Sequence, residues 1–393
     1  MDCYYRATVA EISLDALDRN ILALRRHLAP GTRILASVKA NAYGHGAVEI
    51  ARRAVSVGVD YLGVAFLDEA LQLRASGIDA PILVLGYTPP EGYPLARERG
   101  ITITLYREEM LEAAASLPAS EKKLKAHVKI DSGMGRLGLL PGGEAERFLE
   151  KAFALPQLDI EGLYTHFACA DEQDKTYTMK QVERFASVTN YVRRSGMPIS
   201  IIHSGNSATG IDLPEHTGDM LRLGIGMYGL YPSAEVREEA VRLEPVLTLK
   251  TAITHVKSLP AGEGISYGTR YFTQGEEAIG TLPIGYADGF SRMLSGKAEA
   301  LVRGRRVPVL GTICMDQCMI GLNAAQSAGA VKIAPGEEVV LIGRQGEAQI
   351  TAEEVASKLG TINYELICML ATRIPRVYRS NGEVVAVVNP LQG

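Results

Sequence analysis

The sequence of 393 residues is long enough for two or three domains, and its 47% hydrophobic and 22% charged content is that of an ordinary globular protein. The formal net charge of −4, from 41 basic and 45 acidic residues, gives no support for nucleic-acid binding. No apolar run is long enough to span a bilayer, and the first residues lack a secretory signal, so we predict a cytoplasmic protein that does not enter membranes.

Strand-like runs alternate with amphipathic helical stretches over residues 1–229. The first helical stretch follows Ser13, whose hydroxyl can cap it. The apolar runs occupy 33–39, 61–66, 81–86, 101–106, 126–131, 159–167, 200–205 and 221–229. These eight strand–helix units predict an α/β fold with an N-terminal (β/α)8 barrel of the TIM type. The alternative is a doubly wound open sheet, whose dinucleotide-binding form is disfavoured because no G-x-G-x-x-G turn follows the first strand.

A polar segment, residues 232–245, interrupts this pattern and is interpreted as a barrel-terminal helix and a crossing. Beyond it, β-like runs are separated by Gly and Pro, and only residues 351–360 are firmly helical, with Thr351 as cap and Glu354 three residues later. We therefore predict a barrel domain over residues 1–240 and a mostly β domain over residues 241–393. The first residues, about twelve of them, can pair with the second domain instead.

The cysteines give no sign of a disulfide framework or a metal site. Their number, five, is odd, and they are scattered along the chain, which favours a reducing compartment. Cys314 and Cys318 have no second close pair, so we predict no zinc and no other metal.

Basic side chains follow several of the predicted barrel strands. Chemistry in such barrels takes place at the C-terminal ends of the strands. The residues at those ends are Lys39, Lys129, Arg136, His166, Asn206, Ser207, Arg222, Gly224 and Ile225. Two lysines, two arginines and a histidine on one rim pack a core poorly but hold an anionic ligand well. Taken alone, Lys39 is better explained as a lysine that reaches solvent from a strand end.

Nine short motifs run through nearly the whole chain. They are "VKANAYGHG" (38–46), "KIDSGMGRLG" (129–138), "THFACADE" (165–172), "HSGNSAT" (203–209), "RLGIGMYG" (222–229), "ISYGTRY" (265–271), "PIGYADG" (283–289), "ICMDQ" (313–317) and "TINYE" (361–365). In this order they resemble alanine racemase, a family of pyridoxal 5'-phosphate (PLP) enzymes with a barrel and a β domain. The resemblance implies a homodimer with shared active sites that interconverts L- and D-alanine and supplies D-alanine for peptidoglycan.

The resemblance also assigns the reacting groups. Lys39 corresponds to the lysine that holds PLP covalently and serves as the base on one face of the substrate. Tyr267, contributed by the partner chain, corresponds to the second base, and it needs nearby positive charge because its ordinary pKa is about 10. Arg136 is the implied source of that charge, and it binds the substrate carboxylate together with the backbone N–H of Met315, also from the partner.

The remaining assignments concern the cofactor and the approach of the substrate. Tyr43, Ser207, Gly224, Ile225 and Tyr364 correspond to phosphate donors, and Asn206 to a further cofactor-binding residue. Arg222 corresponds to the residue that faces the pyridine nitrogen, and His166 to a residue that supports it. Because arginine stays protonated and donates to the ring nitrogen, that nitrogen stays unprotonated. The PLP ring is then a weaker electron sink, which suits racemisation. Lys129 corresponds to a lysine that is often carbamylated, where the carbamate would orient Arg136. The substrate access path would include Asp171, Tyr286, Arg292 and Ile362, near Thr312, which replaces a basic residue of several relatives.

Three alternatives stay open or are weakened by particular residues. A racemase for serine or a wider range of amino acids stays open as an alternative, since one methylene changes selectivity by only about 1–3 kcal/mol. A PLP-dependent decarboxylase of similar architecture would place a carboxylate at the ring nitrogen, against which Arg222 argues. A regulatory PLP-binding barrel would lack the long β domain that bears Tyr267 and Met315.

Overall fold

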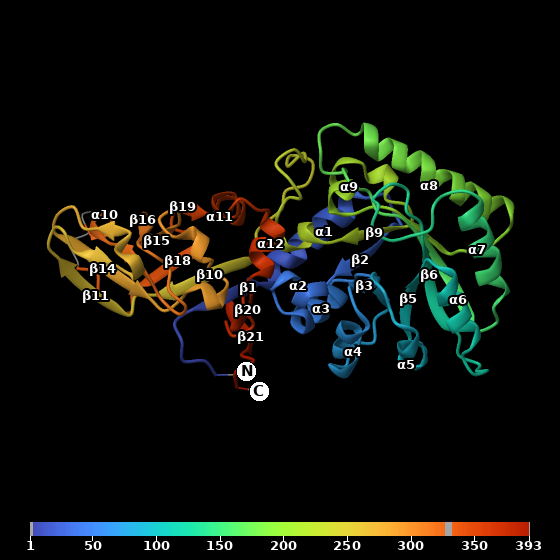
Figure 1. Ribbon diagram of the computed structural model, residues 1–393, viewed down its shortest axis with the longest axis horizontal. Coiled ribbons are helices and arrows are strands. Elements are labelled where there is room, and N and C mark those ends of the chain that lie inside the picture. Colours follow the sequence, from blue (N-terminus) through green and yellow to red (C-terminus); the bar gives the residue numbers. More distant parts are fainter. Residues whose placement is uncertain (1–2, 327–331, 393) are drawn as a thin grey trace. The chain divides into compact units, whose positions relative to one another are not determined.

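The computed structural model describes residues 3–326 and 332–392, which divide into two compact units (Figure 1). Residues 17–42 and 47–244 form the barrel unit. Residues 1–16, 43–46 and 245–393 form the β unit. The division therefore groups the first sixteen residues and a short piece after Lys39 with the C-terminal part of the chain.

Eight parallel strands form the barrel, which confirms the predicted TIM-type fold. They are β2 (Arg33–Ser37), β3 (Tyr61–Val64), β4 (Ile82–Val84), β5 (Ile101–Leu105), β6 (Leu124–Lys129), β7 (Leu158–Tyr164), β8 (Ile201–His203) and β9 (Met220–Leu223). Their order is β8-β7-β6-β5-β4-β3-β2-β9. Between the end strands, Asp219 N–H donates to Ile202 O at 2.7 Å and Arg222 N–H to Gly205 O at 3.1 Å, so the barrel is nearly closed.

The barrel helices follow the strands because their apolar residues recur at helical spacing. They are α1 (Leu14–His27), α3 (Ala47–Ser56), α4 (Leu67–Ala75), α5 (Tyr93–Glu98), α6 (Glu108–Ala115), α7 (Gly143–Ala154), α8 (Thr176–Arg194) and α9 (Ser207–Asp212). Leu17, Ile21 and Leu24 of α1 are fully buried, at the spacing of one helix face. The Ser13 hydroxyl accepts the Ala16 N–H at 3.2 Å, which confirms the predicted cap.

Residues 232–245 contain no helix, so the predicted barrel-terminal helix is wrong. The segment is a series of turns between Pro232 and Pro245. Side chains hold it in place: Ser233 Oγ donates to Asp171 O at 2.5 Å, and Arg237 N–H donates to Asp212 Oδ1 at 3.1 Å. Such hydrogen bonds to distant residues satisfy the backbone and replace the local helical bonds that the charge pattern favoured.

The β unit is a mostly antiparallel sheet of eleven strands among the described residues. They are β1 (Val9–Ser13), β10 (Leu247–Ala252), β11 (His255–Leu259), β14 (Glu277–Leu282), β15 (Glu299–Val302), β16 (Arg305–Leu310), β17 (Cys318–Gly321), β18 (Glu338–Gln345), β19 (Ala348–Ile350), β20 (Arg376–Ser380) and β21 (Glu383–Val388). The order is β11-β14-β17-β16-β15-β18-β10-β1-β20-β21, with β19 on β18. A separate ribbon pairs β12 (Gly264–Ile265) with β13 (Tyr271–Phe272). Strand β1 pairs antiparallel with β10 and parallel with β20.

Three short helices accompany this sheet: α10 (Asn323–Gln326), α11 (Ala352–Leu359) and α12 (Asn363–Cys368). The Thr351 side chain accepts the Glu354 N–H at 3.1 Å, which confirms the predicted cap of α11. Helix α12, which carries Tyr364, was not predicted, because six residues are too few to show a helical period.

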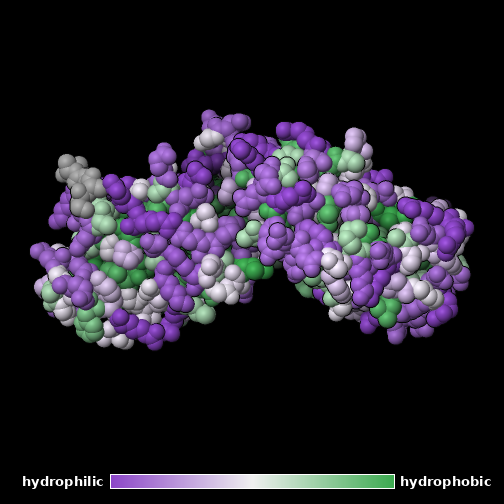
Figure 2. Space-filling model, turned by 90° about the horizontal axis from the view of Figure 1, so that it is seen from above, coloured by the Kyte–Doolittle hydropathy of each residue, from purple (hydrophilic) through white to green (hydrophobic). Residues whose placement is uncertain are grey.

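The surface is largely hydrophilic on the face that Figure 2 shows, with hydrophobic residues scattered over it. Among the described residues, every helix is too short or too polar to cross a bilayer.

Candidate active site

Four cationic side chains and a histidine gather at the C-terminal ends of the barrel strands. Lys39 follows β2, Lys129 ends β6 and Arg222 lies on β9; Arg136 and His166 lie in the loops after β6 and β7. Burial, followed by the charges of Arg222, Arg136 and Lys39, lowers the pKa of Lys129 to about 7. The structure thus brings together the five residues that the sequence placed on one rim, and their combined field suits an anionic ligand.

Arg222 is held in place by four acceptors. Its Nη2 donates to Thr165 O at 2.7 Å, to Ser204 O at 2.8 Å and to His166 Nδ1 at 3.0 Å, and its Nη1 to His203 Nδ1 at 2.9 Å. Burial lowers its pKa to about 10, so the guanidinium stays protonated at neutral pH. Its Nε makes no hydrogen bond to the part of the chain that the structure describes, so this N–H is available to a ligand acceptor.

Tyr164, at the end of β7, lies at the centre of the cluster. The ring is 1% exposed, with Lys129 Nζ at 4.9 Å and Arg222 Cζ at 5.3 Å from its centroid. Its hydroxyl lies 2.9 Å from Thr104 Oγ1 and donates to Leu85 O at 3.2 Å. The face of the Tyr164 ring therefore attracts the two cations by cation–π interaction, as a carboxylate would by its charge.

The segment after Lys39 adopts a rare backbone conformation. Ala40, Asn41, Ala42 and Tyr43 have φ angles of 52°, 54°, 53° and 52°, which is one turn of left-handed helix within α2 (Lys39–Tyr43). Such a conformation costs non-glycine residues roughly 1–2 kcal/mol each. Two hydrogen bonds hold the turn: Ala40 N–H donates to Glu69 Oε1 at 2.7 Å, and Ala47 N–H donates to Asn41 Oδ1 at 2.9 Å. Strain of this kind is concentrated at functional sites.

Backbone N–H groups converge where β9 ends. Ser207 Oγ accepts from Gly224 N–H at 3.0 Å and from Gly226 N–H at 3.2 Å, and its own hydrogen is left for a ligand acceptor. Gly226 was not among the predicted residues. Asn206 Oδ1 accepts from Thr209 N–H at 3.0 Å and caps α9, which gives this side chain a structural role.

The predicted residues of the β unit lie in its loops and in α12. Tyr43 is buried, and its ring lies 6.3 Å from that of Tyr364. Tyr267 and Met315 are 73% and 53% exposed. Thr312 is buried and donates to Tyr267 O at 2.8 Å, so it fixes the backbone that carries the tyrosine.

The four residues predicted for the access path lie in different loops. Tyr286 is 41% and Ile362 is 60% exposed, both in the β unit, and Arg292 is exposed in that unit as well. Asp171 lies in the barrel unit, and burial raises the pKa of its carboxyl.

Sequence reasoning gave no role to His127, Glu161, Tyr164 and His203. All four lie in strand runs that were read from the sequence only as apolar segments, and His203 opens the motif "HSGNSAT". A polar residue inside a buried strand was the available signal, because such residues require a partner in the core.

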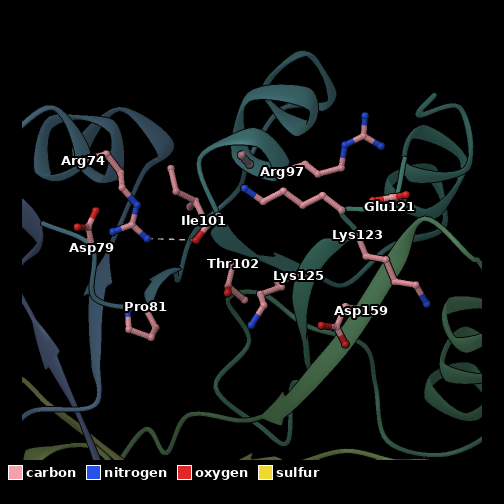
Figure 3. A pocket seen from close by; sticks show the side chains of 13 residues that line it. Arg74, Asp79, Pro81, Arg97, Ile101, Thr102, Glu121, Lys123, Lys125 and Asp159 are labelled. Carbon is pink, nitrogen blue, oxygen red and sulfur yellow. Dashed lines mark hydrogen bonds between the residues drawn. The ribbon is translucent and has the colours of Figure 1, made fainter. Parts of the chain in front are cut away.

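A cavity of about 410 Å³ lies at the other end of the barrel, where strands β4 to β7 begin (Figure 3). Two of its cationic residues are held by partners in the protein. Arg74 donates to four backbone carbonyls at 2.6–3.1 Å, and Lys125 donates to Glu161 at 2.9 Å. Because it lies where the strands begin, the cavity is separate from the cluster around Arg222 at the strand ends.

The chain is similar to known proteins over its whole length. Residues 12–232 match the family described as "Alanine racemase, N-terminal domain", and residues 246–378 match "Alanine racemase, C-terminal domain". An alanine racemase of Halalkalibacterium halodurans is 46% identical, with 100% of both chains covered, and one of Methanococcus maripaludis is 45% identical, with 94% of this chain and 98% of that protein covered. The crystal structure of alanine racemase from Bacillus anthracis with bound L-Ala-P is 42% identical, with 100% of both chains covered and a TM-score of 0.93.

Proposed function

Because this chain belongs to the alanine racemase family, we propose that it interconverts L-alanine and D-alanine with PLP as cofactor. The observation that carries the proposal is the state of Arg222. A buried guanidinium, protonated and held by four acceptors, retains an unused Nε–H amid a cluster of cations. An unprotonated ring nitrogen on a phosphate-bearing cofactor is the acceptor that matches this donor and this field.

PLP, when bound, withdraws electrons from the substrate Cα and makes the α-proton removable. Lys39 would hold the cofactor by its amine at the start of the strained turn. Ser207 offers a hydroxyl hydrogen and Ile225 a backbone N–H for the phosphate. The Gly224 N–H donates to Ser207 Oγ in this structure, so Gly224 would reach the phosphate only after that bond is exchanged. Tyr43 and Tyr364 are proposed as further phosphate donors on the family resemblance, and Asn206 contributes by capping α9.

Two bases on opposite faces are the direct way to racemise a carbon. We assign one face to the Lys39 amine and the other to the Tyr267 hydroxyl of a partner chain, which makes the active unit a homodimer. The exposure of Tyr267 and Met315 supports this assignment, because large side chains exposed in a loop are available to another subunit. Arg136 and the Met315 N–H would bind the substrate carboxylate, and Tyr286, Arg292, Ile362 and Asp171 would line the approach.

Lys129 is proposed to carry a carbamate. Burial and neighbouring cations lower its pKa to about 7, so a neutral amine, the form that reacts with carbon dioxide, is present near neutral pH. The carbamate would replace a buried cation by an anion among Arg136 and Arg222, which removes the repulsion in the cluster.

We place the reaction in the cytoplasm, where the five free cysteines would stay reduced, and we assign its product, D-alanine, to peptidoglycan synthesis. A decarboxylase is disfavoured because the residue proposed to face the ring nitrogen is Arg222 and not a carboxylate.

The test is to incubate the purified protein with PLP and a panel of L-amino acids and to analyse the products by chiral chromatography. We expect D-alanine to form fastest, with slower formation of D-serine. Release of carbon dioxide without a D-amino acid would contradict the proposal, and faster formation of D-serine would identify a serine racemase. After borohydride treatment, peptide mapping should find the cofactor on Lys39.

A further inference from the structure

Polar side chains run through the middle of the barrel, where apolar packing is the rule. Lys125, His127 and Lys129 alternate along β6 and therefore share one face of the strand. His127 and His203 are fully buried. Tyr164 stacks on His203, with ring centroids 4.8 Å apart and planes 11° apart. Buried imidazoles of this kind need partners, and the partners found here form one continuous line.

The line begins at Arg222 and ends at a carboxylate. Arg222 Nη1 lies 2.9 Å from His203 Nδ1, and His203 Nε2 lies 2.9 Å from His127 Nδ1. His127 Nε2 lies 3.5 Å from Glu161 Oε1, an ion-pair distance at which this buried nitrogen makes no well-formed hydrogen bond. Four side chains from β9, β8, β6 and β7 thus connect the cation cluster to the interior near the opposite end of the barrel.

The groups at the two ends of the line fix the direction in which its hydrogen bonds are donated. Arginine can only donate, and an ionised carboxylate can only accept. Burial lowers the pKa of His127 and of His203, so both rings are neutral and each offers one donor and one acceptor. Donation from Arg222 makes His203 Nδ1 an acceptor and puts its hydrogen on Nε2. The same logic puts the hydrogen of His127 on Nε2, facing Glu161.

The opposite arrangement fails at both ends. It would set an N–H of His203 against an N–H of Arg222, and a lone pair of His127 against the carboxylate. Two neutral imidazoles between a donor and an acceptor therefore admit one set of tautomers.

Glu161 is held firmly enough to act as the end of this line. Its carboxylate accepts from Thr102 Oγ1 at 2.9 Å, from Lys125 Nζ at 2.9 Å and from Tyr61 OH at 3.2 Å. Burial alone would raise its pKa, but the neighbouring His127 ring and the hydrogen bonds from Lys125 and Thr102 lower it to about 2, so it is ionised at working pH. Two of these partners, Thr102 and Lys125, line the cavity at the beginning of the strands (Figure 3).

The backbone leaves room for the line as well. Gly162 follows Glu161 on β7, and a Cβ atom at this position would overlap the His127 ring. The space for the His127 ring therefore exists because Gly162 has no side chain, and not because the packing is loose.

We propose that Glu161 is a positioning residue for Arg222: acting through His127 and His203, it fixes both tautomers and so keeps an acceptor at Arg222 Nη1. Without this acceptor, Arg222 Nη1 would lose its hydrogen bond, and the guanidinium could rotate away from its present orientation. The consequence for racemisation rests on the proposed function, because it requires Arg222 to face the cofactor. The tautomers themselves do not depend on that function.

The test is to record long-range 1H–15N correlation spectra of the PLP-loaded enzyme labelled with 15N-histidine. His127→Asn and His203→Asn variants assign the two resonances. We expect both rings of the wild-type enzyme to be neutral with the hydrogen on Nε2. A hydrogen on Nδ1 of either ring, or a charged ring, would overturn the proposal without any variant.

Three variants of the outer end sharpen the test. Glu161→Leu removes the acceptor and should give mixed tautomers of His127 and His203, with kcat lowered about tenfold, as when a supporting residue of a site is lost. Glu161→Gln keeps an acceptor oxygen and should restore the wild-type tautomers, with kcat within about twofold of wild type. Tyr61→Phe is the matched control, because it removes a bond to Glu161 and leaves the carboxylate on His127.

The outcomes separate the two claims. Unchanged tautomers and kcat in a folded Glu161→Leu variant would show that Glu161 positions nothing. If the wild-type enzyme shows the expected tautomers but no racemisation, the proposed function fails and the hydrogen-bonded line remains. If Glu161→Leu does not fold, the wild-type spectrum still tests the tautomers, and a hydrogen on Nδ1 of either ring in Glu161→Gln would overturn the proposal.

Discussion

Ala40 shows how single residues bear the strain of the turn after Lys39. It is exposed and has φ 52° and ψ 49°, a conformation that glycine adopts freely. Ala40→Gly should therefore raise the free energy of unfolding by about 0.5–1 kcal/mol, after allowance for the greater entropy of glycine in the unfolded chain. Denaturant unfolding of the wild type and the variant measures this difference.

The control is Ala113→Gly, in the right-handed helix α6. It should lower the free energy of unfolding by about 0.5–1 kcal/mol. Destabilisation of similar size by both substitutions would show that the left-handed turn is not strained.

Lys129 gives a prediction for pH. Its folded pKa is about 7, so the neutral amine, and with it the carbamate, should increase as the pH rises from 6 to 8. 13C NMR of enzyme equilibrated with 13C-bicarbonate should show a carbamate resonance that grows over this range. The signal should be absent from Lys129→Gln, and a signal that persists in this variant would contradict the assignment to Lys129.

Among the structural elements, the loop 283–289 depends on one buried carboxylate. Asp288 is fully buried and accepts from Arg6 at 2.8 Å, from Arg373 at 2.7 Å and from Gly285 N–H at 3.1 Å. Asp288→Asn should lower the free energy of unfolding by about 2–4 kcal/mol at pH 7, because two cations lose their partner. The matched control is Asp316→Asn, whose exposed carboxylate also binds Arg373 and whose loss should cost under about 1 kcal/mol.

The same carboxylate predicts a pH dependence. Burial alone would raise the pKa of Asp288, but the bonds from Arg6 and Arg373 lower it below its usual range. A depressed carboxyl pKa stabilises the fold above the unfolded pKa of about 4, and this contribution is lost as the pH falls through the folded pKa. The difference in stability between wild type and Asp288→Asn should thus be constant above pH 5 and shrink below pH 4. A difference that does not change with pH would contradict this role.

Secondary-structure elements could be predicted from the sequence where burial produces a recognisable pattern of apolar residues. All eight barrel strands were found, because strands covered on both faces are continuous apolar runs. Residues 232–245 were misread because their turns are held by distant partners such as Asp171 and Asp212, which local pattern does not reveal. The rim of cations could be predicted from strand ends, but the line from Glu161 to Arg222 could not, since it depends on which side chains face the barrel interior.

At the scale of the whole molecule, the proposed reaction needs two chains for each active site. Lys39 belongs to the barrel unit and Tyr267 to the β unit. We propose that the two groups meet across a dimer, with Lys39 serving one face of the substrate and Tyr267 the other. The β unit would then act on the substrate held by the barrel unit of its partner.

Complementation between two inactive variants tests this claim most directly. Lys39→Ala loses the attachment of the cofactor and Tyr267→Ala loses the second base, so each homodimer should be inactive. A heterodimer of the two, formed by subunit exchange and verified by native mass spectrometry, has one site with both groups intact. Racemisation of L-alanine should then recover to roughly half the wild-type rate per dimer, as two-fold symmetry requires. Absence of recovery in verified heterodimers would mean that Lys39 and Tyr267 act within one chain, and it would contradict the shared site.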